Sequence, residues 1–173
     1  ARSEKKSFTE IISERILEFK GMSEAELYEK FSINPKAKGK NSTLIRTMLG
    51  LTGDLDKTQE FQKANMNLRV IRVDKNGLPK EDSPFKTYNF QELIDTDEWE
   101  DSHPYLEIYN KRFLFVVFRE LEPKKFVLDN IKFWGFPDCQ LDEVQRVWQE
   151  TRQILKDGVQ MVIEFQRSSH RVK

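Results

Sequence analysis

The chain has 173 residues, of which 38% are hydrophobic, 12% aromatic and 34% charged. This length fits one domain, residues 1–173, with a single sizeable core, and the composition excludes a disordered chain. No apolar run approaches the roughly 18 residues of a membrane span. The one cysteine cannot form an internal disulfide, which is typical of a reducing compartment. We therefore expect a cytoplasmic protein with no membrane partner.

The 29 basic and 29 acidic residues give a net charge of zero. This balance lowers the expectation of nucleic-acid binding, but the distribution of charge matters more than its sum. Two local groups of basic residues are candidates for contacts with phosphate: Lys36, Lys38 and Lys40 in one, Lys111 and Arg112 in the other. Each group taken alone is more often a solvated surface.

The first third of the sequence predicts helices. Apolar residues recur at helical spacing over residues 7–19, 23–31 and 41–53. Ser7 with Glu10 forms a capping box for the first helix, and the same Ser-x-x-Glu pattern opens the second. Asn41 or Ser42 is expected to cap the third helix.

The rest of the sequence predicts a mixed sheet with a covering helix. Strands are expected over residues 65–73, 85–88, 112–120, 125–135 and 159–165, a short helix over 90–94 and a long helix over 140–156. The segment RFLFVVFRE, 112–120, is almost wholly apolar and predicts a strand buried on both faces. The order of these elements predicts a mixed α/β domain with a helical N-terminal third.

The most informative stretch is QEFQKANMNLRVIRVDKNGLPKEDSPF, residues 59–85. An acidic residue, Glu60, precedes an alternating strand, and a tight turn follows at residues 74–77. Together with GMSEAELYEKF (21–31) and WEDSHPYLEIYNKRFLFV (99–116), this stretch resembles the MutH-like endonuclease family. That family comprises the mismatch-repair endonuclease MutH and GATC-specific type II restriction endonucleases.

The resemblance implies a restriction-endonuclease-like fold and, in active members, phosphodiester hydrolysis that depends on Mg²⁺. Two carboxylates hold the metal and a lysine assists the attacking water. Carried over by position, the first acid falls on Glu60, the second on Asn67 and the lysine on Arg69. A further family lysine falls near Tyr109. The resemblance therefore implies a degenerate site that holds no metal here, with Mg²⁺ expected only in the parent enzyme.

The leading hypothesis is a non-catalytic, allosteric effector half of a restriction endonuclease that recognises GATC. Its partners would be double-stranded DNA, contacted at phosphates through Arg69 and the basic groups above, and the catalytic domain of the same polypeptide. The absence of an initial methionine predicts a fragment of a longer polypeptide, with base-reading segments near or beyond Lys173. Without the resemblance, Asn67 and Arg69 are the polar face of a half-buried strand.

Two alternatives remain open at this point. An active Mg²⁺-dependent nuclease would need a relocated acid such as Asp54, Asp56 or Asp74. A protein-interaction module that has lost DNA binding would also fit the neutral net charge. Metal binding would distinguish the first alternative, and a DNA affinity that depends on salt would argue against the second.

Overall fold

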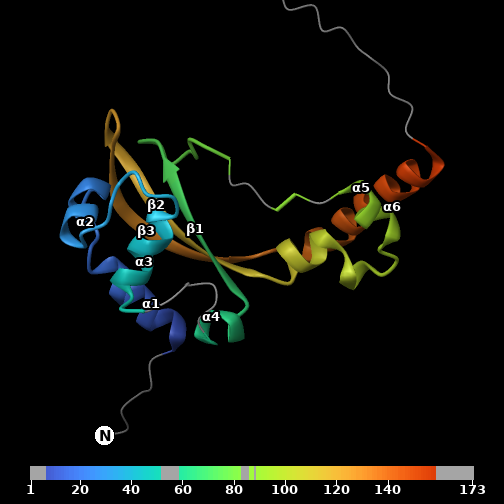
Figure 1. Cartoon of the computed structure of the whole chain (residues 1–173), viewed down its shortest axis with the longest axis horizontal. Coiled ribbons are helices and arrows are strands. Elements are labelled where there is room, and N and C mark those ends of the chain that lie inside the picture. The colour runs from blue at the N-terminus through green and yellow to red at the C-terminus, as the bar shows by residue number, and fades with distance from the viewer. Residues whose placement is uncertain (1–6, 52–58, 83–85, 88, 159–173) are drawn as a thin grey trace, which may run out of the picture.

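The protein was analysed as a computed structural model, which describes residues 7–51, 59–82, 86–87 and 89–158. Helices and a mixed sheet alternate along the chain, so the expected mixed α/β class is confirmed (Figure 1). The elements are α1 (Phe8–Leu17), α2 (Glu24–Lys30), α3 (Lys40–Met48), α4 (Gln59–Lys63), β1 (Met66–Val73), α5 (Phe90–Asp95), η2 (Trp99–Asp101), η3 (Tyr105–Tyr109), β2 (Arg112–Glu122), β3 (Lys125–Gly135), η4 (Asp138–Gln140) and α6 (Leu141–Asp157).

The N-terminal helices begin where their capping residues stand. Ser7 caps α1 and Ser23 caps α2, and in each box the glutamate three residues later binds the backbone N–H of the serine. The prediction that Asn41 or Ser42 caps the third helix is wrong. Helix α3 starts after Gly39, whose φ of 78° suits glycine, and no side chain caps it. Neither Asn41 nor Ser42 is the cap, because both already lie inside the helix.

Within the described residues, the sheet has three strands in the order β1-β2-β3. Strand β1 pairs in parallel with β2, and β2 pairs antiparallel with β3. A parallel pair needs a long connection, and here residues between Val73 and Arg112 supply it with α5, η2 and η3. A β-bulge interrupts the second pairing after Val117. The sheet is therefore mixed and flanked by helices, which is consistent with a restriction-endonuclease-like fold.

One face of the sheet carries the main hydrophobic core. Leu114, Val116 and Phe118 of β2 pack there with Leu128 of β3 and with buried residues of α1, α2, α3, α4 and β1. We call this the covered face. The prediction that 112–120 is buried on both faces is wrong in part, because Phe115 and Val117 are only half-buried. Phe113, on the same side of β2 as these two residues, is fully buried, so this side of the strand is covered near its start.

A second, smaller hydrophobic cluster lies at the other end of the molecule (Figure 1). Leu93, Trp99 and Trp148 are buried together, with the Trp rings 5.5 Å apart. Arg152 of α6 fixes this cluster, since its guanidinium donates to the backbone oxygens of Leu93 and Ile94. The single core expected from the length is thus divided into a large and a small cluster.

Several expected elements are confirmed and others lie elsewhere. Strands β1 and β3, helix α5 and helix α6 match their predicted ranges to within about two residues. The short helix α4 and the π-helical turn η3 were not predicted. The strand over 159–165 lies outside the described residues, as does most of 85–88, of which residues 86 and 87 show no strand. None of the described helices has the length and apolar character to cross a membrane.

Candidate nucleic-acid interface

Asn67 and Arg69 lie on the face of the sheet opposite the main core. Their neighbours Met66 and Leu68 point the other way and are buried in that core. Successive side chains of a strand point to opposite faces, so the two polar residues share one face. In the parallel register Asn67 pairs with Phe113 and Arg69 with Phe115. We call this second side of the sheet the open face, because Phe115, Val117 and their strand partners are half-buried or exposed there, although Phe113 is fully buried.

Arg69 has unused hydrogen-bonding capacity. Its Nη1 reaches only the backbone oxygen of Leu68, at 3.5 Å, and its Nε is buried without a hydrogen-bond partner. A cavity of about 210 Å³ opens beside it at the edge of β1. The lining residues are Asn41, Arg69, Val70, Ile71, Arg72, Glu81 and Asp82. A guanidinium carries five N–H donors, so most of those of Arg69 remain free to meet a ligand.

The donors on this face do not fit Mg²⁺. The ion prefers anionic oxygen ligands and gives up its water reluctantly. Asn67 offers one neutral amide oxygen, and Arg69, two residues along the same face, is permanently cationic and repels a metal. Within the described ranges, no group of three or more His, Cys, Asp or Glu side chains is arranged to hold a metal. The same donors suit an anion such as phosphate.

The other positions of the expected motif lie outside the strands, in α4 and η3. Glu60 falls in α4, next to the fully buried Phe61, and its side chain is outside the described part of the structure. Tyr109 ends η3 and donates its hydroxyl proton to Asp138 at 3.1 Å. That hydrogen bond is the main reason why the pKa of Tyr109 is raised. Tyr109 therefore serves to fix η3 beside η4, and no contact joins it to Arg69.

The relocated acids of the active-nuclease alternative gain no support from the fold. Asp54 and Asp56 lie outside the described residues. Asp74 organises the turn after β1, since its Oδ1 accepts the N–H groups of Asn76 at 2.8 Å and Leu78 at 2.9 Å. The hydrogen bond from Leu78 is the first cause that holds its pKa below the ordinary aspartate value. The carboxylate of Asp74 is thus committed to the backbone.

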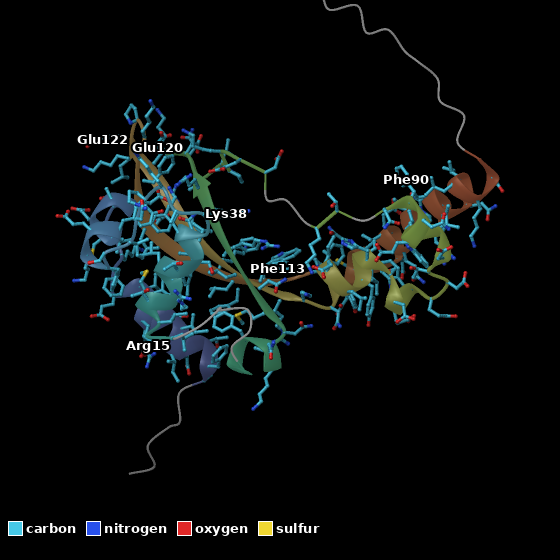
Figure 2. All side chains as sticks on the ribbon, in the orientation of Figure 1. Arg15, Lys38, Phe90, Phe113, Glu120 and Glu122 are labelled. Carbon is cyan, nitrogen blue, oxygen red and sulfur yellow. The ribbon has the colours of Figure 1, made fainter. Side chains whose placement is uncertain are left out.

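The basic candidates form two separate groups. Some of them already have a hydrogen-bond or ion-pair partner, whereas others are exposed. Lys36 and Lys38 are exposed in the loop before α3, where Figure 2 labels Lys38. Lys40 donates to the backbone oxygen of Pro35 and lies over the ring of Tyr28. At the start of β2, Lys111 is 3.6 Å from Glu107, which leaves Arg112 the exposed cation there. Asn41, directly after Lys40, lines the same cavity as Arg69, whereas Arg112 lies at the start of β2.

One basic residue was missed by the sequence analysis. Lys132 of β3 pairs with Phe115 of β2, which in turn pairs with Arg69 of β1. The three therefore form one row across the open face. In the sequence Lys132 is an isolated cation in a strand, and only the registers of two strand pairs bring it into line with Arg69.

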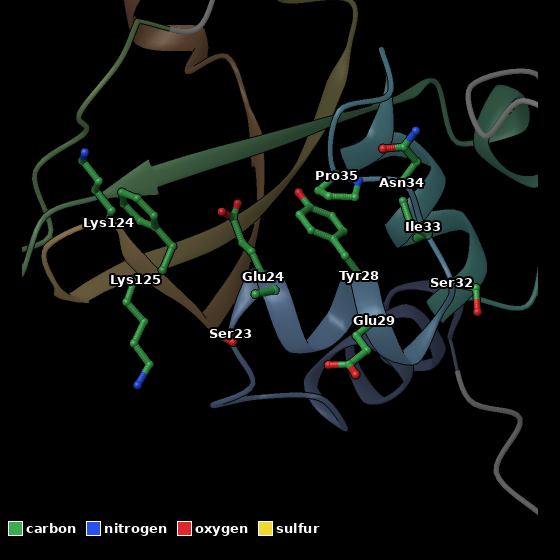
Figure 3. A pocket seen from close by; sticks show the side chains of 12 residues that line it. Ser23, Glu24, Tyr28, Glu29, Ser32, Ile33, Asn34, Pro35, Lys124 and Lys125 are labelled. Atoms are coloured by element: carbon green, nitrogen blue, oxygen red, sulfur yellow. The ribbon is translucent and has the colours of Figure 1, made fainter.

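A larger cavity of about 850 Å³ lies elsewhere, between α2 and the β2–β3 turn. Figure 3 shows Glu24 and Tyr28 pointing into it from α2, with Lys124 and Lys125 on the turn. The Glu24 carboxylate is already held by Arg72, at 3.0 and 3.1 Å. None of the site residues predicted from the sequence lines this cavity. It is distinct from the interface formed by the open face.

Comparison with known proteins relates the chain to the type II restriction endonucleases. The chain is similar to the type II restriction enzyme Sau3AI of Staphylococcus aureus, with 32% identity over an alignment of 167 positions that covers 89% of this chain. The chain spans about one third of that enzyme, 34% of its length. No protein-family model matches the chain. The mixed sheet and its flanking helices agree with this relationship.

Proposed function

We propose that this chain is a non-catalytic DNA-binding domain of a type II restriction endonuclease. One observation carries the proposal. Asn67 and Arg69 occupy one face of β1, where the resemblance to MutH-like endonucleases places a glutamate and a lysine. The loss of a carboxylate removes affinity for a metal, and the guanidinium adds affinity for phosphate. DNA binding is thus retained while hydrolysis is lost.

The proposal extends to recognition of GATC and to an effector role. The chain matches about a third of a restriction enzyme, so a longer polypeptide has room for a separate catalytic domain. In such a protein, the domain would bind one recognition site and stimulate cleavage at another. Differential affinity for two states of the catalytic domain is the thermodynamic requirement for this coupling.

The first experiment tests catalysis. The purified chain is incubated with a plasmid that contains GATC sites, in Mg²⁺ and in Mn²⁺. We expect no cleavage. Cleavage that is abolished by Glu60→Ala would overturn the proposal and restore the active-nuclease alternative. Cleavage that Glu60→Ala leaves unchanged would indicate a contaminating nuclease, which repurification of both proteins removes before the assay is read.

The second experiment tests binding and recognition together. The affinity of the chain for a duplex containing GATC is compared with that for a scrambled duplex of the same composition, at several salt concentrations. We expect a linear fall of log affinity with log salt, because phosphate contacts release counterions. Tighter binding of GATC supports recognition, and equal binding of both duplexes limits the function to backbone contacts. An absence of binding to either duplex favours the protein-interaction alternative.

The third experiment tests the effector role in a longer protein that contains this chain and a catalytic domain. Cleavage of a plasmid with two GATC sites is compared with cleavage of a plasmid with one. We expect faster cleavage of the two-site plasmid and loss of that advantage in Arg69→Ala. The effector role would be contradicted if Arg69→Ala still cleaved the two-site plasmid faster than the one-site plasmid to the same degree. This comparison is made at a concentration where the variant no longer binds DNA through this domain.

A further inference from the structure

The open face contains a patch of nine residues whose arrangement follows from the strand registers. Three rows cross the strands β1, β2 and β3: Asn67–Phe113–Trp134, Arg69–Phe115–Lys132 and Ile71–Val117–Asn130. Directly paired residues of neighbouring strands project to the same side of a sheet. The nine side chains therefore lie on one side of the sheet, where Phe113 is fully buried and the other eight are half-buried or exposed. We call these nine residues the open-face patch.

The charge of the open-face patch is one-sided. Its only charged members are Arg69 and Lys132, which are both positive, although the whole chain has as many acidic as basic residues. Lys132 is exposed and makes no hydrogen bond or ion pair within the part of the chain that the structure describes. Outside the patch, Arg119 pairs with Asp129 at 2.7 Å, and Arg72 pairs with Glu81 at 3.2 Å beside the cavity that Arg69 lines.

The middle of the patch is rigid and aromatic. Phe115 separates the two cations and stacks on Phe113 with ring centroids 5.9 Å apart, and Trp134 lies 5.6 Å from Phe113. These rings leave little room for water between the cations. A floor of low polarity strengthens the attraction of Arg69 and Lys132 for an anion above it. The rings also hold the backbone positions of Arg69 and Lys132 at a constant distance from each other.

We propose that Arg69 and Lys132 form a two-point clamp for neighbouring phosphates of one DNA strand. Their Cα atoms are two strand spacings apart, about 10 Å. Arginine and lysine side chains are long enough to shorten or widen that span to meet phosphates on a strand that rises about 3.4 Å per nucleotide. The clamp rests on the proposed DNA-binding function and names Lys132 of β3 as its second contact. The exposed lysines before α3 lie outside it.

The test uses the full chain and a duplex that contains GATC, with affinity measured at several salt concentrations. We expect Lys132→Ala to reduce the slope of log affinity against log salt by about 0.9, and Arg69→Ala to do the same. If the electrostatic contribution vanishes near 1 M salt, this loss corresponds to about fivefold weaker binding at 0.15 M. The double variant loses about twice the slope, and Lys132→Arg retains the slope of the wild type.

Lys125→Ala is the matched control, because Lys125 is an exposed lysine of the same strand outside the patch. Equal slopes for Lys132→Ala and Lys125→Ala, with the wild type still binding DNA, would overturn the clamp but not the proposed function. If the wild type binds no DNA, the proposed function and the clamp both fail. Binding of an acidic peptide that Lys132→Ala weakens, without binding of DNA, would identify a protein as the occupant and also contradict the clamp.

A second readout follows occupancy of the patch directly. The chain has three tryptophans, and Trp134 lies in the patch whereas Trp99 and Trp148 are buried in the second cluster. We expect DNA to change the tryptophan fluorescence of the wild type, and Trp134→Phe to remove most of this change at DNA concentrations that saturate the variant. A change that persists in Trp134→Phe would place the DNA away from the patch.

Discussion

The two faces of the three-stranded sheet differ although adjacent residues of the same strand supply them. On the covered face, Leu114, Val116 and Phe118 are at most 1% exposed and meet the N-terminal helices. On the open face, Phe115 and Val117 are as apolar but only half-buried. The difference teaches that apolarity alone does not identify a core strand face. The open face combines a rigid aromatic floor with free cations, which is what a binding surface requires.

The comparison is sharpest at two neighbouring valines. Val116 is fully buried on the covered face, and Val117 lies on the open face of the same strand. We expect Val116→Ala to lower the free energy of unfolding by about 2 to 3 kcal/mol, from lost burial plus the cavity left behind. Val117→Ala should cost less than about 1 kcal/mol, because water already reaches that side chain. Denaturant unfolding of both variants measures the difference.

The two valine variants also serve as controls for each other, since the substitution and the strand are the same. Equal costs would mean that an element outside the described residues covers the open face. That outcome would contradict the view of this face as a binding surface. A cost of Val117→Ala that rises only when DNA is bound would instead strengthen it.

The sequence predicted the covered face far better than the open face. Both capping boxes, the strands β1 and β3, and helix α6 follow local rules of spacing, so their ranges were correct. The cap of α3 was missed because glycine at φ 78° leaves no side-chain signature. Phe115 is half-buried because of the way other elements pack around the sheet, and the local sequence pattern carries no information about that packing.

The candidate site was predictable only in part. Asn67 and Arg69 alternate along one strand, so their common face could be read directly from the sequence. Lys132 is aligned with Arg69 only through the register of β1 with β2 and the register of β2 with β3. Strands β1 and β2 are far apart in the sequence, and the register of a strand pair is a property of the folded sheet. Tyr109 was placed near the site by resemblance alone, whereas its hydroxyl is bound to Asp138.

A metal site restored on the open face provides a second test of the difference between the two faces of the sheet. In the triple variant Glu60→Asp, Asn67→Glu and Arg69→Lys, a second carboxylate is added at position 67 beside the one at position 60, and the fixed guanidinium is removed. We expect binding of Mg²⁺ or Mn²⁺ before any cleavage. At a metal concentration ten times the dissociation constant, binding stabilises the fold by about 1.4 kcal/mol. Calorimetry and metal-dependent thermal unfolding measure it.

The matched control for the metal site is Asn130→Glu, which adds one carboxylate to the open-face patch two strands away from β1. We expect no metal-dependent stabilisation of that variant, because a single carboxylate is a poor ligand set. If the triple variant folds and binds no more metal than the wild type, the assignment of Glu60, Asn67 and Arg69 to the nuclease motif is wrong. The covered face should be unaffected in either variant.

The smallest expected effect concerns how the helices are held on the covered face. Ser23 is the buried cap of α2 and forms an isolated β-bridge with Val127 of β3, whereas Ser7 caps α1 from an exposed position. We expect Ser23→Ala to cost about 1 kcal/mol of unfolding free energy and Ser7→Ala about half as much. The terminal turn of α1 can fray, but loss of the cap of α2 disturbs a helix that is paired to the sheet. An equal cost at both positions would show that the contact with β3 adds nothing to the capping box.

The same box gives this last effect a pH dependence. The Ser23 hydroxyl, 2.6 Å from the Glu26 carboxylate, is the first cause that lowers the pKa of Glu26. A carboxyl group whose pKa is lower in the folded state stabilises the fold above its unfolded pKa, and this contribution is lost as the pH falls through the folded pKa. The difference in stability between the wild type and Ser23→Ala should therefore be constant near neutral pH and shrink below roughly pH 4. A difference that stays constant into the acid range would mean that the Ser23 side chain acts only by accepting the backbone N–H of Glu26 and by packing, and that the covered face holds α2 without the charge of Glu26.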